Sequence, residues 1–196
     1  ATTFYIGYDV AFNIAHAASM LDRGVVYAFV HARGGGELGY HWYVDGNGAN
    51  KYNTVKDFKS VLEGLVASKY TSPSKIAIGG FSAGGFAMGN AINNFPQLFK
   101  AALIQQGFLD MIGSQSDPEI PFVKLEWSIW GNPNNKNDFN RMWAMDPYQN
   151  LKRANYPAIF VRTSIDDSTV LVHEALKYVS MVGNDLALDE GIGTCG

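Results

Sequence analysis

Short apolar runs alternate with helical patterns along most of the 196-residue chain. Apolar runs of strand length predict buried strands at residues 24–30, 75–78, 101–104 and 158–161, and a short last strand at 186–188. Apolar residues at helical spacing predict helices at residues 55–66, 83–94 and 174–182. Because the strands are apolar on both faces, we expect a mostly parallel sheet with helices on both faces, an α/β fold.

Two segments add detail to this pattern. Asn53 and Thr54 precede the first predicted helix, where either side chain is expected to act as an N-cap. Residues 107–150 interrupt the alternation, because they contain four prolines, three tryptophans and many asparagines. This composition predicts an irregular excursion or lid.

Composition narrows the function classes. The length suits one domain over residues 1–196, and 47% of the residues are hydrophobic, as in globular proteins. A net charge of −3 gives no basic footprint for nucleic acid, and no apolar run reaches the roughly 18 residues of a membrane span. The N-terminus has no signal-peptide pattern, and the single cysteine, Cys195, forms neither a disulfide framework nor a metal cluster. We therefore expect a cytoplasmic protein without metal or cofactor.

The segment Gly80–Gly84 has the form G-x-S-x-G and connects a predicted strand to a predicted helix. This strand–turn–helix context is the one that a nucleophile elbow requires. It makes Ser82 the candidate nucleophile, and places the Ala83 N–H at the helix start, where it would bind a developing oxyanion. The alternative is a glycine-rich turn with an incidental serine.

The candidate acid follows the predicted strand at 158–161. In proteins with a nucleophile elbow, the order of the triad along the chain is serine, acid, histidine. Asp166 and Asp167 lie beyond this strand, in a segment that precedes a predicted helix. Either carboxylate is placed to orient an imidazole. The alternative is a solvated turn in which an aspartate caps the helix.

A series of motifs extends from about Leu21 to Val182. They include Leu21–Gly24, Val30–Gly39, Trp42, Asp45–Gly46, Lys51, Asn53–Thr54, Asp57–Phe58, Gly80–Gly84, Pro96–Lys100, Trp130–Pro133, Asp146–Asn150 and Tyr156–Pro157. In this series the chain resembles the prolyl oligopeptidase family of serine peptidases, and within it the oligopeptidase B group. The resemblance implies an α/β-hydrolase catalytic domain, which the family pairs with a β-propeller; this chain is expected to be such a domain, incomplete and without the propeller.

The resemblance also assigns roles to individual residues. Ser82 matches the nucleophile, and Asp167, in a D-x-x-V pattern with Val170, matches the triad acid in preference to Asp166. Glu126 matches the first glutamate of an E-x-E-E-W-G-N-P stretch that binds basic P1 side chains. Ser128 and Ile129 replace the two later glutamates, which predicts a weaker and less selective pocket. Without the resemblance, an ordinary surface glutamate is an equally good interpretation of Glu126.

The chain departs from the family at two catalytic positions. The family's oxyanion tyrosine has no clear counterpart, although Tyr5 and Tyr8 lie near its place. The catalytic histidine aligns with Ile192. Of the four histidines, His31 leads the glycine-rich motif and is interpreted as structural, and His41 flanks the same loop. His16 is interpreted as a surface residue, and His173 is a minor candidate for the base.

Three functions follow from these observations. The first is a serine peptidase that cleaves peptides after basic residues by acyl transfer at Ser82. The alternative is a non-catalytic homologue that serves as a binding or structural subunit with a protein partner, motivated by Ile192. A third is a free-standing esterase of the same fold.

Overall fold

The computed structural model describes residues 14–185. Its sheet contains three parallel strands in the order β1-β2-β3, which are β1 (Ala77–Phe81), β2 (Ala101–Gln105) and β3 (Ala158–Arg162). The strands predicted at 75–78, 101–104 and 158–161 are therefore confirmed, the first with a start two residues later. The parallel sheet with its helices confirms the α/β-hydrolase class.

The strand predicted at residues 24–30 is wrong for the described structure. This segment has no strand assignment, and Val25 and Val26 are 45% and 64% exposed. The apolar run met the local requirement for a buried strand, but the described sheet ends at β1. The short strand predicted at 186–188 lies outside the described residues.

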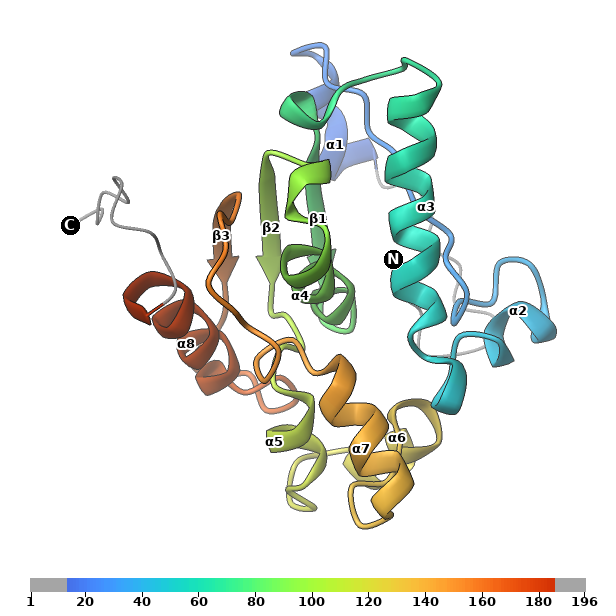
Figure 1. The fold of residues 1–196 in the computed structure, drawn as a ribbon, viewed down its shortest axis with the longest axis vertical. Helices are drawn as coiled ribbons and strands as arrows, with labels where there is room; N and C mark the ends of the chain where they lie inside the picture. Colours follow the sequence, from blue (N-terminus) through green and yellow to red (C-terminus); the bar gives the residue numbers. More distant parts are fainter. Residues whose placement is uncertain (1–13, 186–196) are drawn as a thin grey trace.

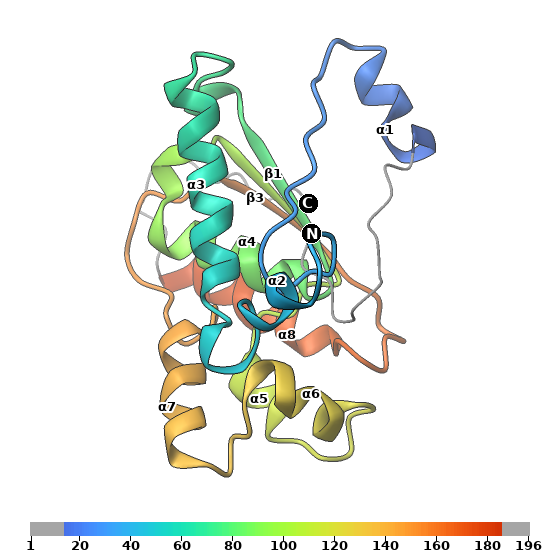
Figure 2. The same ribbon diagram turned by 90° about the vertical axis from the view of Figure 1, so that its right-hand side faces the viewer.

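The helices that were predicted between the strands are present. They are α3 (Asn53–Ala67), α4 (Gly84–Asn94) and α8 (Val172–Ser180), the last followed by a π-helical turn at Met181–Asp185. Shorter helices are α1 (Ile14–Leu21) and α2 (Tyr40–Val44), with 3-10 turns at Gly48–Asn50, Pro73–Lys75 and Pro96–Leu98. Figure 2 shows α3 and α1 on opposite sides of the sheet. None of the helices within residues 14–185 has the length and apolar character of a membrane span.

The hydrophobic core lies between the sheet and α4. Ten of the eleven residues of α4 are buried, and the helix packs against β1 and β2. From the sheet, Ile78, Ala102 and Ile104 enter this core, because alternate residues of a strand point to the same face. On the opposite face, Phe81 and Phe160 are each 62% exposed.

The capping role predicted for Asn53 and Thr54 is wrong. The N-cap of α3 is Tyr52, and neither side chain bonds to the helix start. Instead, the Asn53 amide donates to Asp45 O over 2.8 Å and the Thr54 hydroxyl donates to Arg33 O over 2.7 Å. Both side chains thus fix the glycine-rich segment that precedes α3.

Residues 107–150 are more regular than predicted. They contain α5 (Met111–Gln115), α6 (Val123–Trp130) and α7 (Lys136–Met145), which gather beyond the carboxyl ends of the strands (Figure 1). Three of the four prolines lie between these helices and Pro147 follows α7, so none of them interrupts a helix. The Asn135 side chain caps α7, because its Oδ1 accepts hydrogen bonds from the N–H groups of Asn137 and Asp138 over 2.9 and 3.2 Å.

Candidate active site

Ser82 occupies a strained turn between β1 and α4. Its φ is +53°, a left-handed conformation that costs a non-glycine residue about 1–2 kcal/mol. The Ser82 N–H donates to Gln105 O over 3.0 Å, and the Ser82 carbonyl accepts from the N–H groups of Gly85 (2.7 Å) and Phe108 (2.9 Å). The end of β2 and the start of α4 therefore hold the turn in place.

Two glycines around Ser82 allow the strand and helix to approach. A Cβ at Gly80 would lie 2.5 Å from Gly84 O, and one at Gly85 would lie 2.3 Å from the Gly107 Cα. A Cβ at Gly84, in contrast, would meet no atom within 4 Å. Of the two motif glycines, Gly80 is thus required by packing and Gly84 is not.

Ala83 follows the serine at the N-cap position of α4 and is 3% exposed. Within residues 14–185, no backbone carbonyl accepts a hydrogen bond from its N–H. A helix N-terminus carries partial positive charge, and a free N–H there suits a developing oxyanion. The geometry is compatible with the role predicted for Ala83.

Asp167 lies in the segment between β3 and α8 and is firmly held. Its Oδ1 accepts from the Thr169 N–H and hydroxyl, both over 2.9 Å, and from the Val170 N–H over 3.0 Å. Its Oδ2 accepts from Gln106 Nε2 over 2.9 Å. Burial acts to raise the pKa of Asp167, but these hydrogen bonds outweigh it and lower the pKa below the ordinary value. Asp167 is therefore a fixed carboxylate, whereas the neighbouring Asp166 is exposed.

Gln106 is a site residue that the sequence reasoning missed. It follows β2 directly, has a φ of +45°, and donates its N–H to Arg162 O over 2.7 Å. This conformation directs its amide to Asp167 at the edge of the sheet where Ser82 also lies. The only available signal was the pair of polar residues, Gln105 and Gln106, that follows the predicted strand at 101–104.

No histidine within the described side chains bonds to Ser82 or Asp167. His31 is 3.2 Å from Glu37 and 46% exposed, and both His41 and His173 are exposed. The side chain of His16 and the positions of Tyr5, Tyr8, Ile192 and Cys195 lie outside the described part of the chain. The predicted oxyanion tyrosine and the histidine position are therefore untested.

A pocket of about 160 Å³ opens beside Ser82. Its lining brings Ser82 and Ala83 together with Glu126, and continues along α5 and the segment before α6. Thr169 and Val170, which hold Asp167, form another part of the wall. The three residues that the sequence predicted as nucleophile, oxyanion donor and binding carboxylate thus line one pocket, namely Ser82, Ala83 and Glu126.

Glu126 is the carboxylate of this pocket. Burial raises its pKa, while the Gln115 amide at 3.3 Å, the Trp130 indole and the charge of Lys51 act in the opposite direction. Ser128, at the position of a second family glutamate, is exposed, and Ile129 is 5% exposed in the core. Neither lines the pocket, so Glu126 alone supplies its negative charge among the described lining residues.

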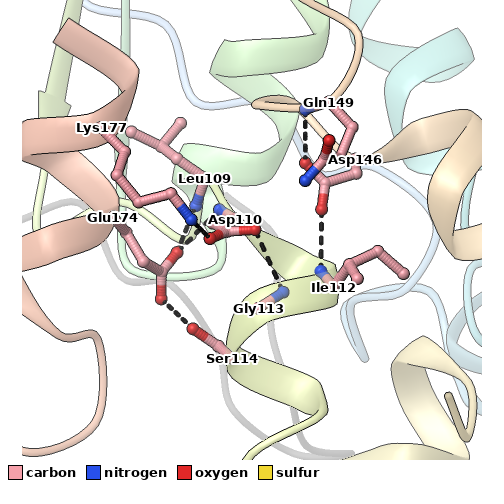
Figure 3. A network of polar contacts seen from close by, with 9 residues as sticks. All are labelled: Leu109, Asp110, Ile112, Gly113, Ser114, Asp146, Gln149, Glu174 and Lys177. Atoms are coloured by element: carbon pink, nitrogen blue, oxygen red, sulfur yellow. Dashed lines mark hydrogen bonds and ion pairs between the residues drawn. The ribbon is translucent and has the colours of Figure 1, made fainter. Parts of the chain in front are cut away.

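Two buried carboxylates hold α5 and the residues just before it (Figure 3). Glu174 of α8 accepts from the N–H groups of Leu109 and Asp110 over 2.7 and 2.9 Å, and from the Ser114 hydroxyl over 2.6 Å. Asp146 accepts from the Ile112 N–H over 2.8 Å. Both carboxylates are fully buried, and together they position α5, whose last residues face the pocket. Sequence reasoning did not identify them.

Comparisons with known proteins agree with this geometry. The model of the prolyl oligopeptidase family matches residues 10–185. Dipeptidyl aminopeptidase BI from Pseudoxanthomonas mexicana is 42% identical over 183 residues, which are 93% of this chain and 25% of the relative. Protease 2 from Moraxella lacunata is 37% identical over 82% of this chain and 23% of its own length. Oligopeptidase B from Leishmania major superposes with a TM-score of 0.86 and 39% identity, over 91% of this chain and 25% of that structure. The chain therefore spans about a quarter of the length of these relatives.

Proposed function

This chain belongs to the prolyl oligopeptidase family, and on that premise we propose that it forms the catalytic domain of a serine peptidase. The observation that carries the proposal is the strained Ser82 turn, which opens on a pocket beside the fixed carboxylate of Asp167. Because the carboxyl ends of parallel strands share one edge of the sheet, β1, β2 and β3 deliver Ser82, Gln106 and Asp167 to the same place.

In the proposed reaction, Ser82 Oγ attacks the carbonyl carbon of a peptide, and its proton passes to a general base. The carbonyl oxygen becomes an oxyanion that accepts a hydrogen bond from the Ala83 N–H. The base gives the proton to the leaving amine as the C–N bond breaks. Water then attacks the acyl-enzyme, the base takes a proton from it and passes it to Ser82 Oγ, and the acid product leaves. Asp167 orients the base. Its Oδ2 accepts one bond from Gln106, and a second lone pair remains for an imidazole N–H. None of the described histidine side chains occupies this position.

Labelling by a fluorophosphonate probe tests the nucleophile. We expect the purified protein to be labelled at Ser82, and the Ser82→Ala variant to remain unlabelled. Ser128→Ala is the matched control, because Ser128 is an exposed serine outside the pocket, and it should label normally. Absence of labelling in the folded wild-type protein would overturn the peptidase proposal.

We further propose that the peptidase cleaves after basic residues, because Glu126 presents a carboxylate to the pocket beside Ser82. Replacing Glu126 by Gln keeps the shape and removes the charge. We expect kcat/KM to fall about tenfold or more for a substrate with arginine at P1. A substrate with citrulline, the uncharged isostere, should be affected far less. Equal loss on both substrates would contradict the assignment.

A non-catalytic role is the second candidate, and the contact of Asp167 favours it. The Oδ2 atom of Asp167 bonds to the Gln106 amide, and no described histidine side chain reaches it. Under this reading the pocket binds a peptide segment of a protein partner without cleaving it. The fluorophosphonate experiment separates the two roles, because a binding subunit is not labelled at Ser82.

A further inference from the structure

Lys51 is buried against α6, the helix that carries Glu126. It follows the Gly48–Asn50 turn, is 1% exposed, and its Nζ lies 4.4 Å from the ring centroid of Trp130. Trp130 is itself 1% exposed and packs on Phe86 and Phe108 at centroid distances of 5.3 and 4.8 Å. An aromatic face stabilises a buried ammonium only in part, so Lys51 also needs a negative charge nearby.

Glu126 supplies that charge. It precedes Trp130 by one helical turn on α6, and residues four apart lie on the same face of a helix. Glu126 is the charged group that acts on Lys51, and its attraction opposes the burial that lowers the pKa of Lys51 to about 7. The same carboxylate lines the pocket. Glu126 thus lines the pocket and also interacts electrostatically with a buried ammonium.

We propose that Lys51 determines specificity in this pocket by competing with a cationic ligand for the carboxylate of Glu126. The inference rests on the proposed function only in taking that ligand to be the P1 side chain of a substrate. Since Ser128 and Ile129 contribute no second carboxylate to the pocket, the positive charge of Lys51 acts on the single carboxylate of Glu126. The attraction of Glu126 for an arginine side chain is then weaker than that of an unpaired carboxylate, and removal of Lys51 strengthens it.

Binding of two small probes tests the competition without any need for catalysis. Benzamidine carries a positive amidinium group, and benzamide is its uncharged counterpart. Calorimetry at pH 6, where Lys51 is mostly protonated, should show that Lys51→Met binds benzamidine about tenfold more tightly than wild type, with benzamide unchanged. Methionine has a similar length and fits an apolar site. Lys56→Met is the matched control, because Lys56 is exposed on α3, and it should bind both probes as wild type does.

The variants Glu126→Gln and Lys51→Met/Glu126→Gln complete a double-mutant cycle with wild type and Lys51→Met. Without the carboxylate, removal of Lys51 should give no tenfold gain for benzamidine. Equal benzamidine affinity in wild type and Lys51→Met, or an equal gain for both probes, overturns the inference. Lys51→Gln provides the same comparison with a polar end group if the methionine variant does not fold. Labelling of Ser82 is measured separately, so a missing label refutes the peptidase and an unchanged benzamidine affinity refutes the role of Lys51.

Discussion

Replacing Glu174 by Gln should change how the stability of the protein depends on pH. Glu174 is fully buried, and its carboxylate accepts hydrogen bonds from Leu109, Asp110 and Ser114 (Figure 3). Burial raises the pKa of Glu174 from 4.5 to about 7, against the effect of these bonds, and the nearby charge of Asp110 adds to the rise. Lys177 of α8 is ion-paired with Asp110 and lies close to the same network.

The magnitude follows from this pKa. A carboxyl group whose pKa is raised on folding holds its proton more tightly in the folded state. The associated stability is fully present below pH 4.5 and is lost as the pH rises to about 7 and beyond. One pKa unit corresponds to about 1.4 kcal/mol, so the loss is about 3 kcal/mol as an upper value. Asp146, whose pKa burial raises to about 6, contributes in the same direction in wild type and variant alike.

Glutamine preserves the geometry and removes the ionisation. Its Oε1 accepts from the two N–H groups, and its Nε2 donates to the Ser114 hydroxyl, which rotates to accept. Urea unfolding between pH 4.5 and 8, followed by tryptophan fluorescence, should show similar stability near pH 4.5. At pH 8 the Glu174→Gln variant should be more stable by up to about 3 kcal/mol. Glu119→Gln, at an exposed position, is the control and should follow wild type. Parallel pH profiles for wild type and Glu174→Gln would refute the reasoning.

Two further predictions concern residues at the carboxyl ends of the strands, where Ser82 lies. Gly85→Ala places a Cβ 2.3 Å from the Gly107 Cα, so it should lower the free energy of unfolding in urea by about 1–3 kcal/mol. Gly84→Ala enters open space, so it should be neutral or slightly stabilising. Equal effects of the two variants would contradict the packing argument. Gln106→Leu removes a hydrogen bond to Asp167, so the pKa of that carboxyl should rise and the acidic limb of the kcat/KM profile should move to higher pH. An unchanged profile would remove Gln106 from the site.

The sequence predicted those parts of the fold that short-range pattern determines. Strands β1, β2 and β3 are apolar on both faces, and the turns that follow them contain Ser82 and Asp167. Once a parallel sheet is inferred, topology places such turns at one edge. The run at residues 24–30 satisfied the same local rule and failed, because a strand also needs a neighbour to pair with, and hydrophobicity alone does not specify one. Thr54 failed as a cap because its hydroxyl bonds to Arg33 O instead.

The charges that modify the site could not be predicted in this way. Glu174 bonds to Leu109, 65 positions away in sequence, and on an amphipathic helix it has the pattern of a solvated residue. Lys51 looks equally ordinary until α6 places Trp130 and Glu126 beside it. Burial and partners, rather than residue type, decide whether such a group is a surface charge or an internal one. Motif matching therefore identifies the Ser82 turn and the Asp167 segment as candidates, whereas the charges around the pocket arise from contacts between elements that only the folded chain brings together.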